Sequence, residues 1–204
     1  MLTRLGIYDL FSYMLPGAMY LGATITALKV FPIGITVPFS SFTPSVLALF
    51  VAVSYLIGIM MAPIKWTPWD RLLPKVDFNS ELNDLQQTYP EISLHIKHNQ
   101  WPVLQANMGL ENFDASLAVD KLRATHIMLR NVSLALCVYF ILALFYIVGH
   151  WDSIFGWIGA FIALSCSALA AKASRMFSSW TFRYTVELMI ARVIDPSDFV
   201  KKKE

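Results

Sequence analysis

Charged residues are scarce in this chain. Asp, Glu, Lys and Arg together make up 15% of its 204 residues, while hydrophobic residues make up 56%. A soluble globular domain carries about 25% charged residues, so a surface this apolar is solvated better by lipid than by water. The composition therefore argues against an ordinary soluble domain and predicts an integral membrane protein. The net charge of +2 is too small to indicate direct nucleic-acid binding.

Cysteines and catalytic motifs are scarce as well. The two cysteines, Cys137 and Cys166, fall inside apolar runs, and we expect both to be reduced and buried in a helix bundle. The sequence contains no nucleophile elbow, no phosphate-binding glycine loop and no redox CxxC pair. We therefore expect a protein that is not an enzyme and that needs no cofactor.

The chain does contain long apolar runs. They cover residues 10–30, 46–64, 132–148 and 153–171, and a bilayer crossing needs about 20 such residues. None of these runs alternates polar and apolar residues as a barrel strand does. The pattern predicts an all-α polytopic membrane protein with four transmembrane helices. Its parts are a transmembrane hairpin (1–64), a loop region (65–131), a second transmembrane hairpin (132–171) and a helical extension with a tail (172–204).

Positive charges lie almost entirely on one side of these runs. Of the 16 Lys and Arg residues, all except Lys29 precede the first run, separate the second run from the third, or follow the fourth. Such a bias marks the cytoplasmic side of a membrane protein. We therefore predict a protein of the bacterial inner (plasma) membrane, with both termini and the loop region in the cytoplasm.

The last two helices are predicted to be longer than the bilayer is thick. No helix breaker interrupts residues 114–148, and no proline interrupts residues 153–194. Because about 20 residues suffice to cross the bilayer, both helices should continue into the cytoplasm as a stalk. An apolar stripe on the last helix then needs a partner, most simply the helix that leads into the third run. The stripe consists of Met176, Phe177, Trp180, Tyr184 and Leu188.

The loop region is predicted to contain two short helices. Asn79 or Ser80 should cap the first, which runs to Tyr89 and ends because Pro90 follows. The second would cover residues 91–101.

A metal site is geometrically possible on the second of these helices. Glu91, His95 and His98 are spaced four and three residues apart, which places them on one helix face. No HExxH motif or cysteine pair supports the site. A solvated helix is therefore favoured over a metal-dependent enzyme, and we expect no bound metal.

Aromatic and basic side chains of the loop and the stalk are candidates for a surface that binds a cytosolic protein. The alternative is that the tryptophans anchor the chain at the membrane interface and that the basic groups meet anionic lipid headgroups. The candidate residues are Trp66, Trp69, Arg71, Lys121, Arg123, His126, Trp180, Arg183 and Tyr184.

Small residues form a second candidate surface, on the fourth run. Gly156, Ala160, Ala163 and Ser167 recur at helical spacing, which permits two helices to approach closely. The spacing does not decide whether the second helix belongs to the same chain or to another. We predict a homo-oligomer.

Asp, Glu, Arg and His are missing from the middle of the four runs. A proton-coupled transporter or a voltage sensor normally needs such a group within the membrane. Hydroxyl groups and an apolar gate suffice for a pore. An oligomeric pore that acts as an abortive-infection effector therefore stays open as the alternative function.

Two short segments and the layout of the chain resemble a known group of proteins. Residues 8–17 read YDLFSYMLPG, and residues 55–58 read YLIG. With the arrangement of two spans, a loop and two spans, they resemble small four-span membrane proteins of bacterial phage defence, such as the membrane subunit of the Kiwa anti-phage system. The resemblance implies a homo-oligomeric inner-membrane sensor that detects infection at the envelope and works with a cytosolic DNA-binding effector. It implies no catalytic residue.

Overall fold

The computed structural model describes residues 2–31, 43–64, 68–73, 77–90 and 113–193. Over these residues the fold is all-α, as predicted, with five α-helices, one short 3-10 helix and no strand. The chain divides into two compact units. The first comprises residues 1–74 and 124–174, and the second comprises residues 75–123 and 175–204.

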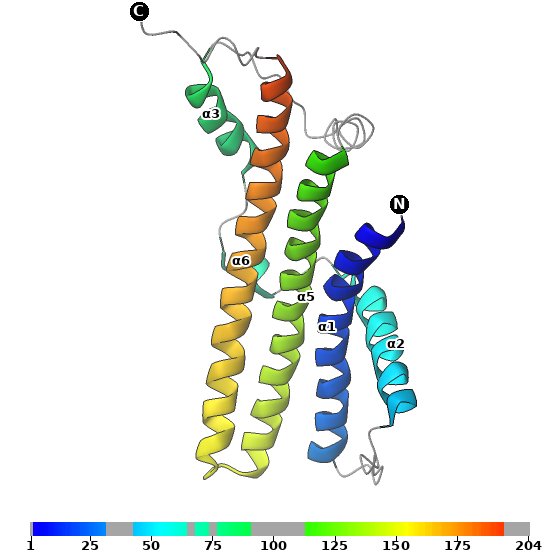
Figure 1. Ribbon diagram of the computed structural model, residues 1–204. Helices are drawn as coiled ribbons and strands as arrows, with labels where there is room; N and C mark the ends of the chain where they lie inside the picture. The colour runs from blue at the N-terminus through cyan, green and yellow to red at the C-terminus, as the bar shows by residue number, and fades with distance from the viewer. Residues whose placement is uncertain (1, 32–42, 65–67, 74–76, 91–112, 194–204) are drawn as a thin grey trace, which may run out of the picture. The chain divides into compact units, whose positions relative to one another are not determined.

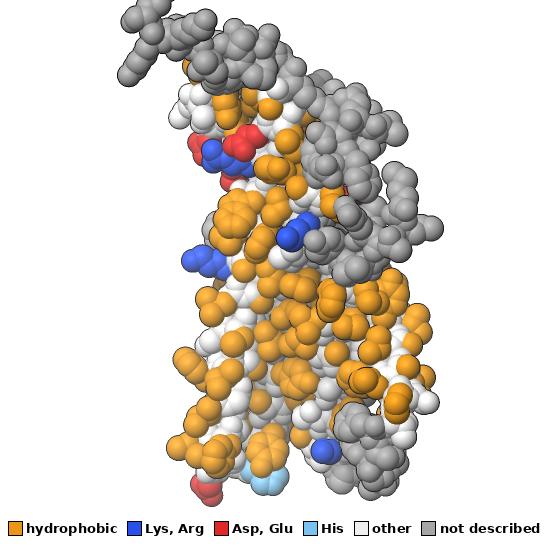
Figure 2. Space-filling model, viewed as in Figure 1, with side chains coloured by type: hydrophobic (Ala, Val, Ile, Leu, Met, Phe, Trp, Pro, Cys, Tyr) orange, Lys and Arg blue, Asp and Glu red, His pale blue; other side chains and the backbone are white. Residues whose placement is uncertain are grey.

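Among the residues that the structure describes, three helices are long and apolar enough to cross a membrane. They are α2 (Pro44–Met61), α5 (Phe113–Gly149) and α6 (Ile154–Val193). Figure 2 shows hydrophobic side chains covering most of the viewed face of the first unit. These observations confirm that the chain has the composition of a membrane protein. Helix α1 (Leu2–Val30), which contains the first predicted span, is not one of the three.

Helices α5 and α6 are continuous over almost the whole of their predicted lengths. Helix α5 was predicted over residues 114–148, and helix α6 over residues 153–194; each bound agrees within one residue. With 40 residues, α6 is about 60 Å long at 1.5 Å per residue. That length is about twice the thickness of a bilayer core, as the absence of proline predicted.

In the first unit, α1 and α2 pack with their backbones in close contact (Figure 1). A Cβ atom on Gly17 would collide with the backbone carbonyl of Ser54, and one on Gly58 would collide with that of Tyr13. Glycine is therefore required at both positions by the approach of the two backbones. At the start of α2, the hydroxyl of Thr43 accepts a hydrogen bond from the Val46 amide at 3.4 Å and caps the helix.

Helices α5 and α6 form an antiparallel hairpin through a tight turn (Figure 1). The His150 amide donates to the Ile147 carbonyl at 3.1 Å, and the Ser153 amide donates to the His150 carbonyl at 2.9 Å. The buried residues of α6 in the first unit are all small, and most are spaced alternately by four and three residues. This is the spacing of a coiled-coil seam, and it is occupied by Gly156, Ala160, Ala163, Ser167, Ala170 and Ser174.

In the second unit, α3 (Phe78–Thr88) packs against the end of α6. Leu85 is buried against Phe182, Val186 and Ile190, which lie on one side of α6. The prediction that Asn79 or Ser80 caps this helix is wrong. The cap is Asp77, because its carboxylate accepts a hydrogen bond from the Asn79 amide at 3.0 Å.

The buried side of α6 in this unit also differs from the predicted one. Met176, Trp180 and Tyr184, which were expected to pack against a neighbouring helix, are exposed. Residues of a different face, from Phe182 onward, form the core with α3 instead. Helical spacing predicted one apolar face here, and Met176, Trp180 and Tyr184 of that face stay at the surface.

Candidate functional site

Trp69 was expected at a partner surface or at the membrane interface, but the structure gives it an internal contact. It lies in the 3-10 helix Pro68–Asp70, is partly buried, and donates a hydrogen bond from its indole Nε1 to the hydroxyl of Ser167 at 2.8 Å. The contact ties the segment after α2 to α6. Trp66, which was predicted to share this surface, lies outside the described residues.

Ser167 is the centre of a buried polar cluster between α5 and α6. Its hydroxyl donates to the backbone carbonyl of Ser133 at 2.8 Å, and the Ser133 hydroxyl donates to the carbonyl of Ser167 at 2.9 Å. The Cys137 sulfur lies 3.1 Å from the Ser167 hydroxyl. A hydroxyl has one proton and two lone pairs. Since its proton is directed to Ser133, the oxygen accepts from Trp69 and from the Cys137 thiol.

A similar exchange occurs seven residues along each helix, between His126 and Ser174. The Ser174 hydroxyl donates to the His126 carbonyl at 3.1 Å, and His126 Nδ1 lies 2.8 Å from the Ser174 carbonyl oxygen. A carbonyl oxygen only accepts, so this contact requires the proton on Nδ1. His126, predicted for a partner or lipid surface, is therefore a packing residue of the α5–α6 seam.

We call this set of residues the polar seam: Trp69, His126, Ser133, Cys137, Ser167 and Ser174. The structure also shows which helix packs against the small residues of α6, a choice that their spacing left open. The small residues of α6 face α5 of the same chain, since a Cβ atom on Gly156 would lie 3.0 Å from the Ile147 side chain. The stripe is used within the chain, so it supplies no contact for a second copy.

The other side of α5 is held to α1 and α2. Ser12 donates to the Ala124 carbonyl at 3.2 Å, and Tyr20 donates to the Asn131 carbonyl at 3.3 Å. Arg130 donates from its guanidinium to the carbonyl of Ala62 at 2.9 Å and so satisfies the end of α2. These contacts were not predictable from the sequence, because a lone hydroxyl or arginine at a helix end gives no signal of its own.

Two buried polar side chains of this unit, Ser54 and Asn131, have no hydrogen-bond partner for their side-chain polar atoms in the structure, and Asn131 is the larger. Its side chain is 1% exposed, and neither amide atom has a hydrogen-bond partner in the structure. A buried amide that lacks a partner costs about 1–3 kcal/mol of stability. Asn131 therefore marks a place where packing, and not hydrogen bonding, determines the position of the side chain.

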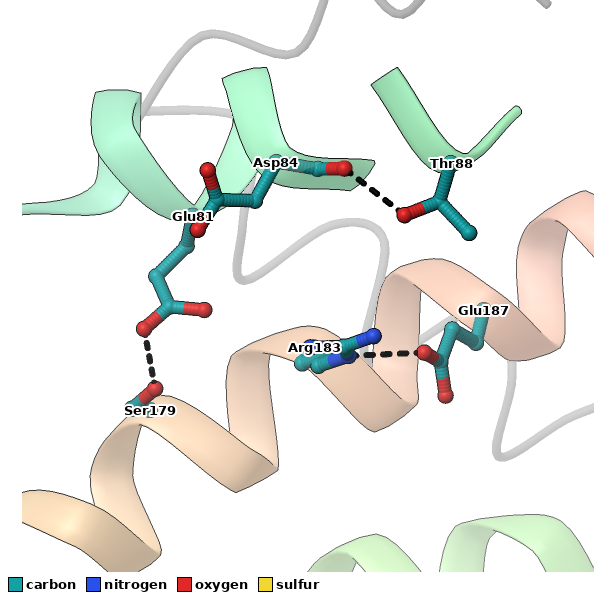
Figure 3. A network of polar contacts seen from close by, with 6 residues as sticks. All are labelled: Glu81, Asp84, Thr88, Ser179, Arg183 and Glu187. Carbon is teal, nitrogen blue, oxygen red and sulfur yellow. Dashed lines mark hydrogen bonds and ion pairs between the residues drawn. The ribbon is translucent and has the colours of Figure 1, made fainter. Parts of the chain in front are cut away.

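The remaining predicted surface residues are exposed. Arg71 lies in the first unit, and Lys121 and Arg123 lie in the second. In the second unit, Arg183 donates to the Glu187 carboxylate at 2.8 Å along the same helix (Figure 3). Figure 3 also shows Glu81 of α3 reaching Ser179 of α6, whose hydroxyl donates to it. This bond fixes α3 on α6 beside the hydrophobic core.

The exposed aromatic face is the main feature of the second unit's surface. Met176, Trp180 and Tyr184 follow one another at four-residue intervals and are 44%, 47% and 37% exposed. The ring of Phe177 meets that of Trp180 edge to face, with centroids 5.2 Å apart. We call Met176, Phe177, Trp180 and Tyr184 the aromatic face. Large exposed apolar groups that gather on one helix are typical of interaction sites.

The cysteines and the possible metal ligands are the last candidate residues. Both cysteines are free, as expected, but Cys166 is exposed on the outside of α6 and only Cys137 is buried. Over the described part of the chain, no group of three His, Cys, Asp or Glu side chains could hold a metal ion. Glu91, His95 and His98 lie outside that part, so the structure does not test this hypothesis.

Comparison with protein-family models, with curated proteins and with solved structures found no significant match.

Proposed function

We propose that this chain is a non-enzymatic sensor and scaffold subunit of the bacterial inner membrane, and that it recruits a cytosolic effector protein. In this proposal α1 is the first of four membrane spans, and both termini and the second unit are cytoplasmic. The layout and the resemblance to phage-defence proteins suggest that the effector is a DNA-binding protein of an anti-phage system. The active form is a homo-oligomer.

The charge distribution supports this orientation. Every Lys and Arg except Lys29 lies in the first turn of α1, between the end of α2 and Arg130 in the first half of α5, or from Lys172 of α6 onward. Arg130 and Lys172 stand about 20 residues from the α5–α6 turn, which is the length of one bilayer crossing. The parts of α5 and α6 that belong to the second unit then lie outside the hydrocarbon core.

The observation that carries the proposal is the aromatic face. In water, exposed aromatic side chains on one helix are stabilised when a partner covers them, because their apolar area is large. Tryptophan and tyrosine are enriched among the residues that dominate binding energy at protein interfaces. Arg183 stands beside this face and is able to add a charged contact at the rim.

A co-purification experiment tests the proposal. The full-length protein in mild detergent should retain a specific cytosolic protein from the native host, and a Trp180→Ser/Tyr184→Ser variant should lose it. The matched control is Trp151→Ser, which removes a tryptophan that is 69% exposed in the α5–α6 turn and should leave recruitment unchanged. Equal retention by all three proteins would refute the role of the aromatic face.

The pore is a separate outcome that liposomes distinguish. The hydroxyls of Ser133 and Ser167 are directed into the α5–α6 contact, so they are not free to line a water-filled path. We expect liposomes with a high load of purified protein to stay impermeable to ions. Ion flux that depends on protein concentration would favour the pore and would contradict the scaffold proposal.

A further inference from the structure

A groove of about 870 Å³ opens in the first unit between α1, α5 and α6. Its walls are almost entirely apolar, with Met19, Leu136, Leu142 and Ile162 among the lining residues. None of the residues that line it is Asp or Glu. An apolar groove with a few polar groups at one end is the usual form of a site for a small amphipathic ligand.

The groove has the length of one acyl chain. Along α5 it extends from Leu136 to His150, which is about 20 Å at 1.5 Å per residue. One leaflet contributes about 15 Å of the roughly 30 Å hydrocarbon core. The groove therefore reaches from the middle of the bilayer to the headgroup level at the side of the α5–α6 turn.

The polar end of the groove carries a single cation. Lys29 lines the groove and is exposed, and it is the one Lys or Arg of the chain on this side of the membrane spans. His150 lines the same end, and its ring stacks on that of Tyr146 with centroids 4.5 Å apart. A lysine at the headgroup level attracts a phosphate, and the tyrosine and histidine offer hydrogen bonds to its oxygens.

Gly159 leaves room along the wall of the groove. A Cβ atom at this position would have no atom within 4 Å, whereas one at Gly156 would press against Ile147 at 3.0 Å. Gly156 thus serves helix packing, and Gly159 keeps open space in the groove. A side chain added at Gly159 would fill this space and would not disturb the backbone.

We propose that this groove binds an anionic phospholipid of the outer leaflet, with one acyl chain along α5 and α6 and the phosphate at Lys29. The charge of Lys29 is what selects this occupant. A zwitterionic lipid such as phosphatidylcholine carries the same phosphate, but its own headgroup cation already neutralises that phosphate and would lie beside Lys29. The site does not depend on recruitment of a cytosolic partner. It does require that α1 lie in the membrane beside α5.

Thermal unfolding and native mass spectrometry test the site together. Full-length protein in detergent is mixed with phosphatidylglycerol or with phosphatidylcholine of the same acyl chains. We expect phosphatidylglycerol to raise the unfolding temperature more than phosphatidylcholine does, and to remain bound at one molecule per chain. Lys29→Gln should abolish the difference between the two lipids. Gly159→Leu should abolish retention of both.

Two matched control variants show whether a loss of lipid binding arises at the groove. Lys172→Gln removes the same charge from an exposed position on α6 outside the groove, and Gly149→Leu adds the same side chain in open space beside it. Both should bind phosphatidylglycerol as the unchanged protein does. An equal loss in Lys29→Gln and Lys172→Gln would indicate general electrostatic attraction and would overturn the proposal.

Other results would also reject the lipid. Unchanged lipid retention by Gly159→Leu would place the lipid elsewhere. A change in oligomer mass with that variant, without any change in lipid retention, would assign the groove to a second copy of the chain. If Gly159→Leu does not fold, the comparison of Lys29→Gln with Lys172→Gln decides the question, because neither variant alters packing.

Discussion

Ser133 and Ser167 donate hydrogen bonds to each other's backbone carbonyl oxygens, at 2.9 and 2.8 Å. This exchange requires the backbones of α5 and α6 to lie close together, which small residues allow. These two hydroxyls are therefore part of the helix contact and do not line a pore. The same two hydroxyls, with Trp69 and Cys137, make the seam specific for one register of the hairpin.

Loss of the Ser167 hydroxyl should destabilise the first unit. Ser167→Ala leaves the Trp69 indole and the Ser133 carbonyl without this partner, and we expect a loss of about 1–3 kcal/mol in the free energy of unfolding. The control is Ser165→Ala, two residues away and half-buried, for which the structure gives no such contact. Unfolding in detergent, followed by circular dichroism, measures both.

A double-mutant cycle then isolates the Trp69–Ser167 hydrogen bond. Trp69→Phe keeps most of the ring and removes the donor, and interhelical hydrogen bonds in membranes average about 0.6 kcal/mol. The two substitutions should be non-additive, because each removes one partner of the same bond. Strict additivity would show that the 2.8 Å contact contributes no coupling energy.

The extent of α5 and α6 was predictable because helix length depends on local features. Proline and glycine are the residues that end helices, and neither interrupts the last 30 residues of α6. The small-residue stripe was predictable for the same reason, since it is a matter of spacing. Gly156 and Ser167 were both recognised in this way, although Ser174 was not.

The contacts between helices were less predictable than the helices themselves. An apolar face shows that a helix is suited to packing, but it does not show which neighbour covers it. Trp180 and Phe182 lie on nearly opposite faces of one helix, since residues two apart are separated by about 200° at 3.6 residues per turn, and both are apolar. Which one is buried depends on where α3 docks, and Leu85 of α3 selects the face of Phe182. The role of Trp69 was hidden for the same reason, since its partner is 98 residues away.

Glycine at position 58 should be indispensable for the α1–α2 contact. Gly58→Ala places a methyl group against the Tyr13 backbone, which has no rotamer that relieves the clash. We expect the free energy of unfolding to fall by about 1–3 kcal/mol, which is the usual cost of overpacking. Gly159→Ala is the matched control, since it adds the same group in open space. A Gly58→Ala protein as stable as this control would contradict the backbone contact.

Replacement of Asn131, in contrast, should stabilise the protein. Asn131→Leu has a similar volume and removes a buried amide that has no hydrogen-bond partner in the structure. We therefore expect the free energy of unfolding to rise by about 1–3 kcal/mol. Ser133→Ala, in which a paired hydroxyl is lost, should lower it in the same assay. Destabilisation by Asn131→Leu would mean that the amide is satisfied in the native membrane, for instance by water or by another chain.

The second unit should depend on one side chain of α3. Leu85 is 1% exposed and contacts the α6 core, and truncation of a buried leucine costs about 2–5 kcal/mol. Leu85→Ala should therefore release α3 and expose it to limited proteolysis, which gel electrophoresis detects. The control is Leu72→Ala, since Leu72 is 74% exposed. Because the polar seam belongs to the first unit, its thermal unfolding should change little in Leu85→Ala. A loss of both units together would show that α3 docking and the membrane helices fold as one cooperative body.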